Sequence, residues 1–169
     1  MKKTVWTYGT FSAALLIALM AVIVPQLRAH RMGLADTLGY TSMLVAALVI
    51  FFGIRSYRQN AGQGRLTFGR GFAVGLLITV VSAAFYAAAF LILYFYVAPD
   101  FGEIFSACMV ERQQLAGAGP QEIAATAEQA AALKRLYDQP LTNVALSFGT
   151  SLPVGIAASA IAAAILRRR

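Results

Sequence analysis

The chain of 169 residues is 59% hydrophobic and only 12% charged, with a mean hydropathy of +0.68. This composition excludes an ordinary soluble domain, whose core could not enclose so many apolar side chains. The net charge of +7 does not indicate a nucleic-acid partner, because basic residues are expected beside the cytoplasmic ends of membrane spans. One cysteine and one histidine exclude an intrachain disulfide and any site built from two histidines.

Four long runs without charged residues predict an all-α fold, an integral membrane four-helix bundle in a single domain over residues 1–169. About 20 helical residues cross a hydrocarbon layer of about 30 Å. The predicted spans cover about residues 5–27, 38–54, 71–97 and 141–166. The second span is near the lower length limit, so we expect it to take a turn from its flanks. Tyr94 and Tyr96 suit an aromatic belt at the membrane surface.

The first span also resembles the start of a cleaved signal peptide. Lys2 and Lys3 precede an apolar run, as they would in such a peptide. The run is long for a signal core, and no A-x-A-like cleavage site precedes His30. We therefore expect it to be a membrane span.

The segment at about residues 98–139 predicts a helical hairpin between spans three and four. Five residues share one helical face, which is expected to lie against an apolar surface: Phe101, Ile104, Phe105, Cys108 and Met109. Burial is therefore the expected state of Cys108. The sequence Gly-Ala-Gly-Pro at 117–120 interrupts this helix, and Pro120 suits the first position of a second one.

Basic residues predict the orientation of the bundle. The turn between spans two and three contains four arginines: Arg55, Arg58, Arg65 and Arg70. With a cytoplasmic N-terminus, nine basic residues lie inside and five outside, which favours both termini in the cytoplasm and an extracytoplasmic hairpin. The four arginines are expected to contact anionic lipid headgroups. A small anion nest at Gly62-Gln63-Gly64 is a less specific alternative.

Small residues predict where the helices approach each other, because close packing rather than escape from water joins helices in lipid. Span four has such residues at successive i+4 positions, and span three has a shorter series: Ser147, Ser151, Gly155 and Ser159, with Gly71 and Gly75. These stripes are predicted to serve helix packing within one bundle or an oligomer interface. Pro153 is expected to kink span four, and a gating hinge there is a further possibility.

The sequence contains no recognisable catalytic pattern. Neither H-E-x-x-H nor G-x-S-x-G occurs, and no charged residue lies inside a predicted span, which disfavours proton-coupled transport. His30 with Asp36 would be a weak acid–base pair, and a solvated loop histidine is the simpler interpretation. The polar residues within the spans are expected to form interhelical hydrogen bonds: Ser12, Ser42, Thr79, Thr142 and Asn143. We expect no enzymatic activity, cofactor or metal.

The stretch from Gly53 to Thr79 reads GIRSYRQN, a glycine-bearing turn, and LTFGRGFAVGLLIT. Together with the aromatic third span around Tyr86, it resembles the bacterial membrane family of unknown function 4199. The resemblance implies a four-span inner-membrane protein with an outer segment before the last helix. It supplies no catalytic residue.

These observations lead to two functional hypotheses. The first is a noncatalytic scaffold or accessory subunit that contacts membrane lipid and associates with itself or with another envelope protein. The alternative is an oligomeric channel or lipid-handling transporter. The alternative requires a polar lining or a lateral groove, whereas a closed and dry bundle would count against it.

Overall fold

The computed structural model describes residues 1–29, 31–61 and 65–167. Over these residues the chain forms six α-helices and one short π-helical turn. They are α1 (Lys2–Arg28), α2 (Met32–Asn60), α3 (Phe68–Ile92), the π-helical turn η1 (Leu93–Val97), α4 (Phe101–Leu115), α5 (Pro120–Tyr137) and α6 (Pro140–Leu166). The predicted all-α fold class is confirmed.

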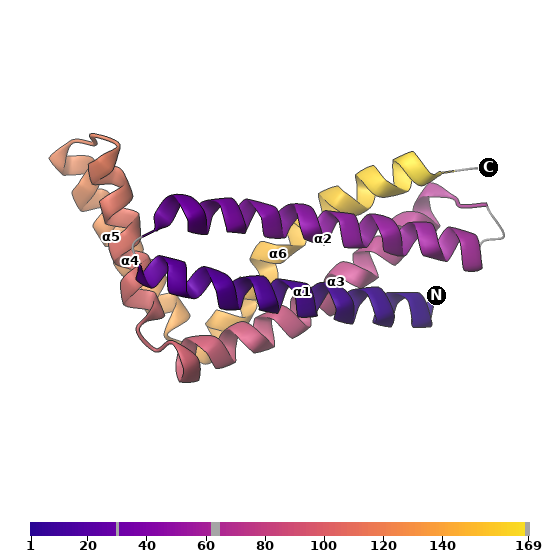
Figure 1. Cartoon of the computed structure of the whole chain (residues 1–169), viewed down its shortest axis with the longest axis horizontal. Coiled ribbons are helices and arrows are strands. Elements are labelled where there is room, and N and C mark those ends of the chain that lie inside the picture. Colours follow the sequence, from indigo (N-terminus) through magenta and orange to yellow (C-terminus); the bar gives the residue numbers. More distant parts are fainter. Residues whose placement is uncertain (30, 62–64, 168–169) are drawn as a thin grey trace.

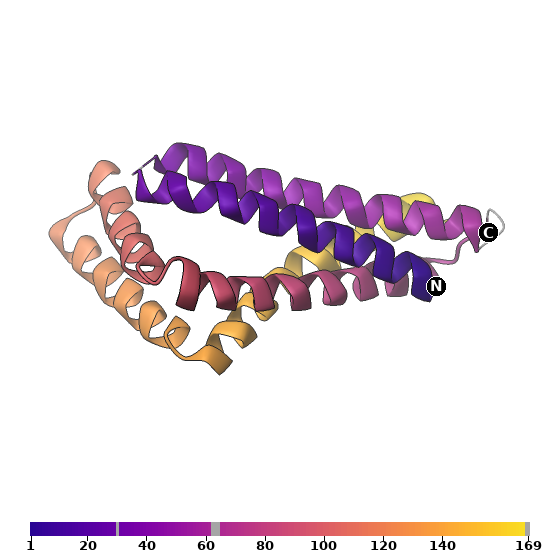
Figure 2. The same ribbon diagram turned by 60° about the horizontal axis from the view of Figure 1, so that its bottom comes forward.

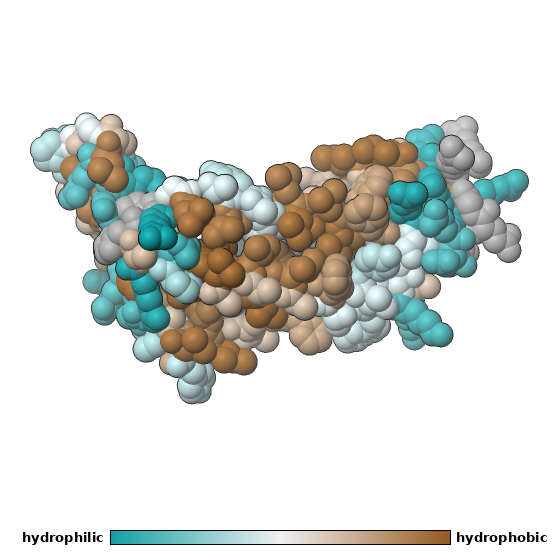
Figure 3. Space-filling view, in the orientation of Figure 1, coloured by the Kyte–Doolittle hydropathy of each residue, from teal (hydrophilic) through white to brown (hydrophobic). Residues whose placement is uncertain are grey.

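Four helical segments are long and apolar enough to cross a membrane: Lys2–Arg28, Gly33–Asn60, Phe68–Val97 and Pro140–Leu166. Successive spans run in opposite directions, so Lys2 and Leu166 lie at the same end of the bundle as the α2–α3 connection (Figure 1). We call this the arginine end, and the opposite end, which bears α4 and α5, the hairpin end. Hydrophobic side chains cover the middle of the bundle and hydrophilic ones gather at its two ends (Figure 3). The chain is therefore a multi-span membrane protein.

The second span is longer than the sequence predicted. Helix α2 begins at Met32 and ends at Asn60, well outside the apolar run at 38–54. Hydropathy identifies only the part of a helix that suits lipid, whereas arginine, serine and glutamine also sustain helical backbone in the polar flank. Residues 55–60 of the arginine-bearing turn belong to α2, and α3 begins at Phe68, so part of this polar segment is helical.

Small residues bring α3 and α6 together along most of their length. A Cβ atom added to Gly75 would lie 2.6 Å from the Ser159 Oγ, and one added to Gly71 would lie 3.2 Å from the Ala163 Cβ. Gly155 likewise faces Thr79. The stripes thus face each other inside one chain at Gly71, Gly75, Gly155 and Ser159, all of them buried. The other two predicted packing residues, buried Ser147 and half-buried Ser151, line cavities instead.

The four spans pack closely only toward the arginine end. There the core includes Ile54, Val74 and Ile78, each fully buried. Toward the hairpin end, α6 crosses α3 and diverges from α2 (Figure 2). A smaller apolar cluster of Met20, Val24, Leu93 and Ala98 joins α1 to η1 and the start of the hairpin.

The hairpin follows the sequence prediction closely. Helix α4 ends at Leu115 and α5 begins with Pro120 in its first turn. Gly117, between them, has a φ of 75°, a backbone conformation that glycine adopts without steric cost. Cys108 is buried, as expected, and Phe101 packs on the rings of α3 and η1.

Candidate functional site

A cavity of about 320 Å³ lies among α1, α2, α3 and α6. We call it the span cavity. Most of its lining is apolar, with contributions such as Leu16 and Met20 from α1, Met43 and Ala46 from α2, and Val154 from α6. It lies at membrane depth, because every one of these residues belongs to a predicted membrane span.

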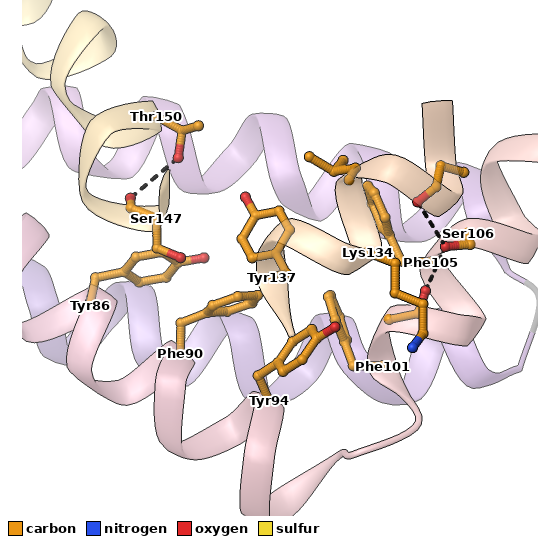
Figure 4. A pocket seen from close by; sticks show the side chains of 13 residues that line it. Tyr86, Phe90, Tyr94, Phe101, Phe105, Ser106, Lys134, Tyr137, Ser147 and Thr150 are labelled. Atoms are coloured by element: carbon orange, nitrogen blue, oxygen red, sulfur yellow. Dashed lines mark hydrogen bonds between the residues drawn. The ribbon is translucent and has the colours of Figure 1, made fainter. Parts of the chain in front are cut away.

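A second cavity of about 200 Å³ adjoins the first at the hairpin end, where α3 and η1 meet α4, α5 and α6. We call it the aromatic cavity (Figure 4). The two cavities share Tyr86, Phe90, Phe101 and Thr150 in their linings. The two cavities are therefore adjacent, and these four side chains form their common boundary.

Aromatic rings form the wall of the second cavity. Tyr86, Phe90 and Tyr94 recur every four residues on α3 and η1, so they share one helical face. The ring centroid of Phe90 lies 5.6 Å from that of Phe101 and 5.9 Å from that of Tyr137, both edge to face. Such pairs contribute about 0.5–1.5 kcal/mol beyond their buried area, which makes the wall rigid.

Ser147 presents a hydroxyl group that the protein leaves unpaired. Its side chain is only 4% exposed and lines the aromatic cavity, yet its Oγ has no hydrogen-bond partner among the described residues. The Tyr86 ring lies beside it and points its hydroxyl toward the same space (Figure 4). A buried polar group without a partner costs about 1–3 kcal/mol, which a ligand with a matching polar group would offset.

The charged groups beside this cavity compensate one another. The Lys134 Nζ lies 3.1 Å from Asp138 Oδ2, and the Tyr94 hydroxyl donates a hydrogen bond of 2.7 Å to Asp138 Oδ1. The hydrogen bond from Tyr94 and the neighbouring Lys134 ammonium lower the pKa of the Asp138 carboxyl.

The prediction that Tyr94 belongs to an aromatic belt at the membrane surface is wrong. This side chain points inward and is 5% exposed, whereas Tyr96 is 83% exposed.

Two ion pairs join the hairpin to the ends of α1 and α2. The Arg28 guanidinium binds both carboxylate oxygens of Asp100, just before α4. The Arg112 Nη2 lies 2.6 and 2.7 Å from the two carboxylate oxygens of Asp36. Hydrogen bonding to Arg28 lowers the pKa of Asp100. The hairpin is thereby held against the bundle at both ends of α4.

We expect acid to loosen the hairpin. The pKa values of Asp100 and Asp138 are lower in the folded protein than the value of about 3.9 expected in the unfolded chain. Above the unfolded-state pKa, both ionised carboxylates contribute their full stabilisation. This contribution is lost as the pH falls through the lower pKa of the folded protein. Thermal unfolding in detergent between pH 7 and pH 3 measures this loss. Asp100→Asn should flatten the pH dependence, and an unchanged profile in this variant would contradict the assignment.

The arginines predicted to contact lipid differ in their surroundings. Arg55, Arg65 and Arg70 are exposed, whereas Arg58 is half-buried and its Nη1 donates to the Leu166 carbonyl oxygen at 3.4 Å. Arg58 thus also closes the C-terminal end of α6. The predicted nest at residues 62–64 lies outside the described residues, as does His30, while Asp36 is engaged by Arg112.

The polar residues within the spans behave in two ways. Ser82 donates to Ser12 at 3.1 Å, joining α3 to α1, and the Asn143 amide donates to the Tyr137 carbonyl at 3.0 Å, joining α6 to α5. The expectation of interhelical hydrogen bonds is wrong for Thr79 and Ser42, whose hydroxyls donate to carbonyl groups of their own helices. A serine or threonine hydroxyl in a helix can bond to a carbonyl group of the preceding turn, as these two do.

The aromatic cavity was not predicted from the sequence. Its signal is the four-residue spacing of Tyr86, Phe90 and Tyr94, of which Tyr94 was expected at the membrane surface and Tyr86 carried part of the family resemblance. The partner ring of Tyr137 could not be found in this way. It reaches the cavity only because α5 folds back onto the end of α3.

The fold and the apolar cavities define a multi-span membrane protein with a cap of two helices at one end. Residues 7–168 match the model of a family described as a protein of unknown function, DUF4199, and the chain belongs to this family. The family resemblance predicted from the sequence is thereby confirmed. No curated protein and no solved structure matches the chain.

Proposed function

We propose that the protein is a noncatalytic inner-membrane protein that holds the hydrocarbon tail of a lipid in the span cavity. The observation that supports this proposal is the largely apolar chamber of about 320 Å³ lined by residues of all four membrane spans. Close-packed interiors leave few voids larger than a water molecule, and ligand sites begin at about 300 Å³. A chamber of this size and lining, set within a bilayer, suits an acyl chain.

The shape of the bundle offers the tail a route from the membrane. Helices α2 and α6 diverge toward the hairpin end, and both contribute residues to the span cavity. Met43, one of these residues, is 49% exposed on α2, so the chamber reaches the lipid-facing surface there. Among the residues that the structure describes, no charged one lines this cavity, which gives no support to an ion path. The lipid-handling alternative therefore fits the geometry better than a channel.

Filling the span cavity should expel the lipid. Ala46 lines the cavity from α2, whereas Ala84 of α3 is exposed and does not line it. In native mass spectrometry of protein from mild detergent, Ala46→Phe should retain markedly less lipid than the wild type, and Ala84→Phe should retain the same amount. Ala83→Leu, at a second lining position, guards against a folding defect in the first variant. Wild-type retention by both cavity variants would refute the proposal.

We further propose that the arginine end faces the cytoplasm and binds anionic headgroups. The exposed Arg55, Arg65 and Arg70 support this, at about 1 kcal/mol for each charge near an anionic surface. Replacing these three with glutamine should reduce retention of phosphatidylglycerol, while α6 keeps its contact with Arg58.

The orientation is tested separately by cysteine labelling. In a Cys108→Ala background, Gln59→Cys should be labelled by an impermeant maleimide only after the cells are opened. Labelling of Gln59→Cys in intact cells would show that the arginine end lies outside the cytoplasm and would contradict the proposed orientation.

A role as an accessory subunit is a second candidate. The hairpin of α4 and α5 projects from one end of the bundle, and Leu115 near its tip is 79% exposed (Figure 1). Gly71, Gly75, Gly155 and Ser159 give no support to self-association, because α3 and α6 pack against each other at these residues. A photoreactive amino acid at position 115 tests this role. Reproducible cross-linking to one envelope protein would support it, and cross-links to lipid alone would not.

A further inference from the structure

We propose that the aromatic cavity receives the polar end of an uncharged lipid, namely diacylglycerol, with Ser147 and Tyr86 as its hydrogen-bonding partners. This inference rests on the proposed function, since the span cavity would hold the acyl chains of the same molecule. It adds the chemical class of the ligand and the residues that select it.

The arrangement of the two cavities sets the direction of the ligand. Tyr86, Phe90, Phe101 and Thr150 belong to both linings, so an elongated molecule that passes between these side chains would reach from one cavity into the other. The span cavity lies among the apolar spans, whereas the aromatic cavity reaches Ser106 of α4 and Lys134 of α5 in the polar hairpin. A lipid would therefore place its tail among the spans and its polar end beneath the hairpin.

The unpaired hydroxyl of Ser147 indicates a ligand with its own hydrogen-bonding group. This side chain is 4% exposed and lines the aromatic cavity, and it makes no hydrogen bond within the described residues. The hydroxyl of Thr150, one turn further along α6, donates a hydrogen bond of 3.2 Å to the Ser147 backbone carbonyl and not to the Ser147 Oγ. An ester carbonyl or the free hydroxyl of diacylglycerol would satisfy the Ser147 and Tyr86 hydroxyls together.

The electrostatic balance of the cavity favours an uncharged polar end. Lys134 is the cation in its lining, and its ammonium group is neutralised by Asp138, which also accepts the Tyr94 hydrogen bond. A phosphate placed among the aromatic rings would find no uncompensated positive charge there, and burying an unpaired charge is costly. The exposed arginines that attract phosphate lie at the opposite end of the bundle.

The test uses photoreactive diacylglycerol in nanodiscs, with photoreactive phosphatidic acid of identical chains and a photoreactive long-chain alkane as the other probes. Labelling by diacylglycerol should map to peptides that line both cavities and should be competed by unlabelled diacylglycerol more strongly than by phosphatidic acid. Ser147→Ala and Tyr86→Phe should each weaken competition by diacylglycerol by about three- to tenfold, the worth of one hydrogen bond.

Two controls separate this inference from the proposed function. Thr142→Ala removes a hydroxyl from the same helix as Ser147 that belongs to neither cavity lining and is bonded to the Gln139 Oε1 at 3.3 Å, so it should leave competition unchanged. The alkane should label the span cavity equally in all variants. Two results would overturn the diacylglycerol inference and leave the proposed function standing. In the first, the alkane labels the span cavity but diacylglycerol competes no better than phosphatidic acid. In the second, Ser147→Ala and Tyr86→Phe behave as the wild type. If no probe labels the cavities, the proposed function falls with it.

Discussion

Gly155→Ala is expected to destabilise the bundle by about 1–3 kcal/mol, the usual cost of overpacking a closely fitted interior. A Cβ atom at this position would lie 2.5 Å from the Thr79 Oγ1 and 2.8 Å from the Thr79 Cβ. Thr79 cannot turn away freely, because it is β-branched and its hydroxyl is bonded to the Gly75 carbonyl at 3.0 Å. The added methyl group would therefore push α3 and α6 apart, and these two helices share the most extensive contact among the described helices.

Gly149→Ala supplies the matched control. It lies on the same helix, and nothing approaches within 4 Å of the position that its Cβ would occupy. Thermal unfolding in detergent should show a clear loss of stability for Gly155→Ala and no loss for Gly149→Ala, which gains helix propensity. Equal stability of the two variants would show that α3 and α6 are not in close contact at Thr79.

Gly102→Val is expected to release the hairpin from the bundle. A Cβ atom at this position of α4 would collide with the Tyr94 hydroxyl and would lie 3.2 Å from the Lys134 Cγ. The Tyr94 hydroxyl would have to move off Asp138, which breaks the hydrogen bond between η1 and the C-terminal end of α5. Because Tyr94 also contacts Phe101 and Tyr137, the wall of the aromatic cavity would open with it.

Hydrogen exchange measures this release directly. Amides of α4 and α5 should lose about tenfold or more of their protection in Gly102→Val, while amides of α3 near Val74 and Ile78 should keep theirs. Ala107→Val provides a control on the exposed face of the same helix. Retained protection of the hairpin in Gly102→Val would show that its contact with Tyr94 contributes little to holding it.

Much of the architecture could be predicted because the membrane imposes strong rules on sequence. Long uncharged runs are readable as spans, and the break at Gly117 to Pro120 is readable as a hairpin turn. Helix ends were less predictable, as α2 shows, because hydropathy reports the lipid boundary rather than the end of the hydrogen-bonded backbone. The i+4 stripe on α6 indicated a close helix contact, but only the structure placed α3 opposite it.

The candidate site was harder to predict, because it depends on contacts between distant segments. The sequence identified Ser147 as a packing residue, and nothing in it could show that this hydroxyl lacks a partner. Tyr94 looked like a surface aromatic, since its neighbour Tyr96 is one. Its inward direction follows from the π-helical turn over Leu93–Val97 and from Asp138, which is 44 residues away in sequence.

The most direct measurement is a structure of the protein in nanodiscs made from its native lipids. We predict an elongated density in the span cavity, bounded by Ala46 of α2 and Val154 of α6, with its polar end beside Tyr86 and Ser147. A bundle in which α2 closes onto α6 along its whole length, with neither cavity nor density, would contradict the lipid-binding account.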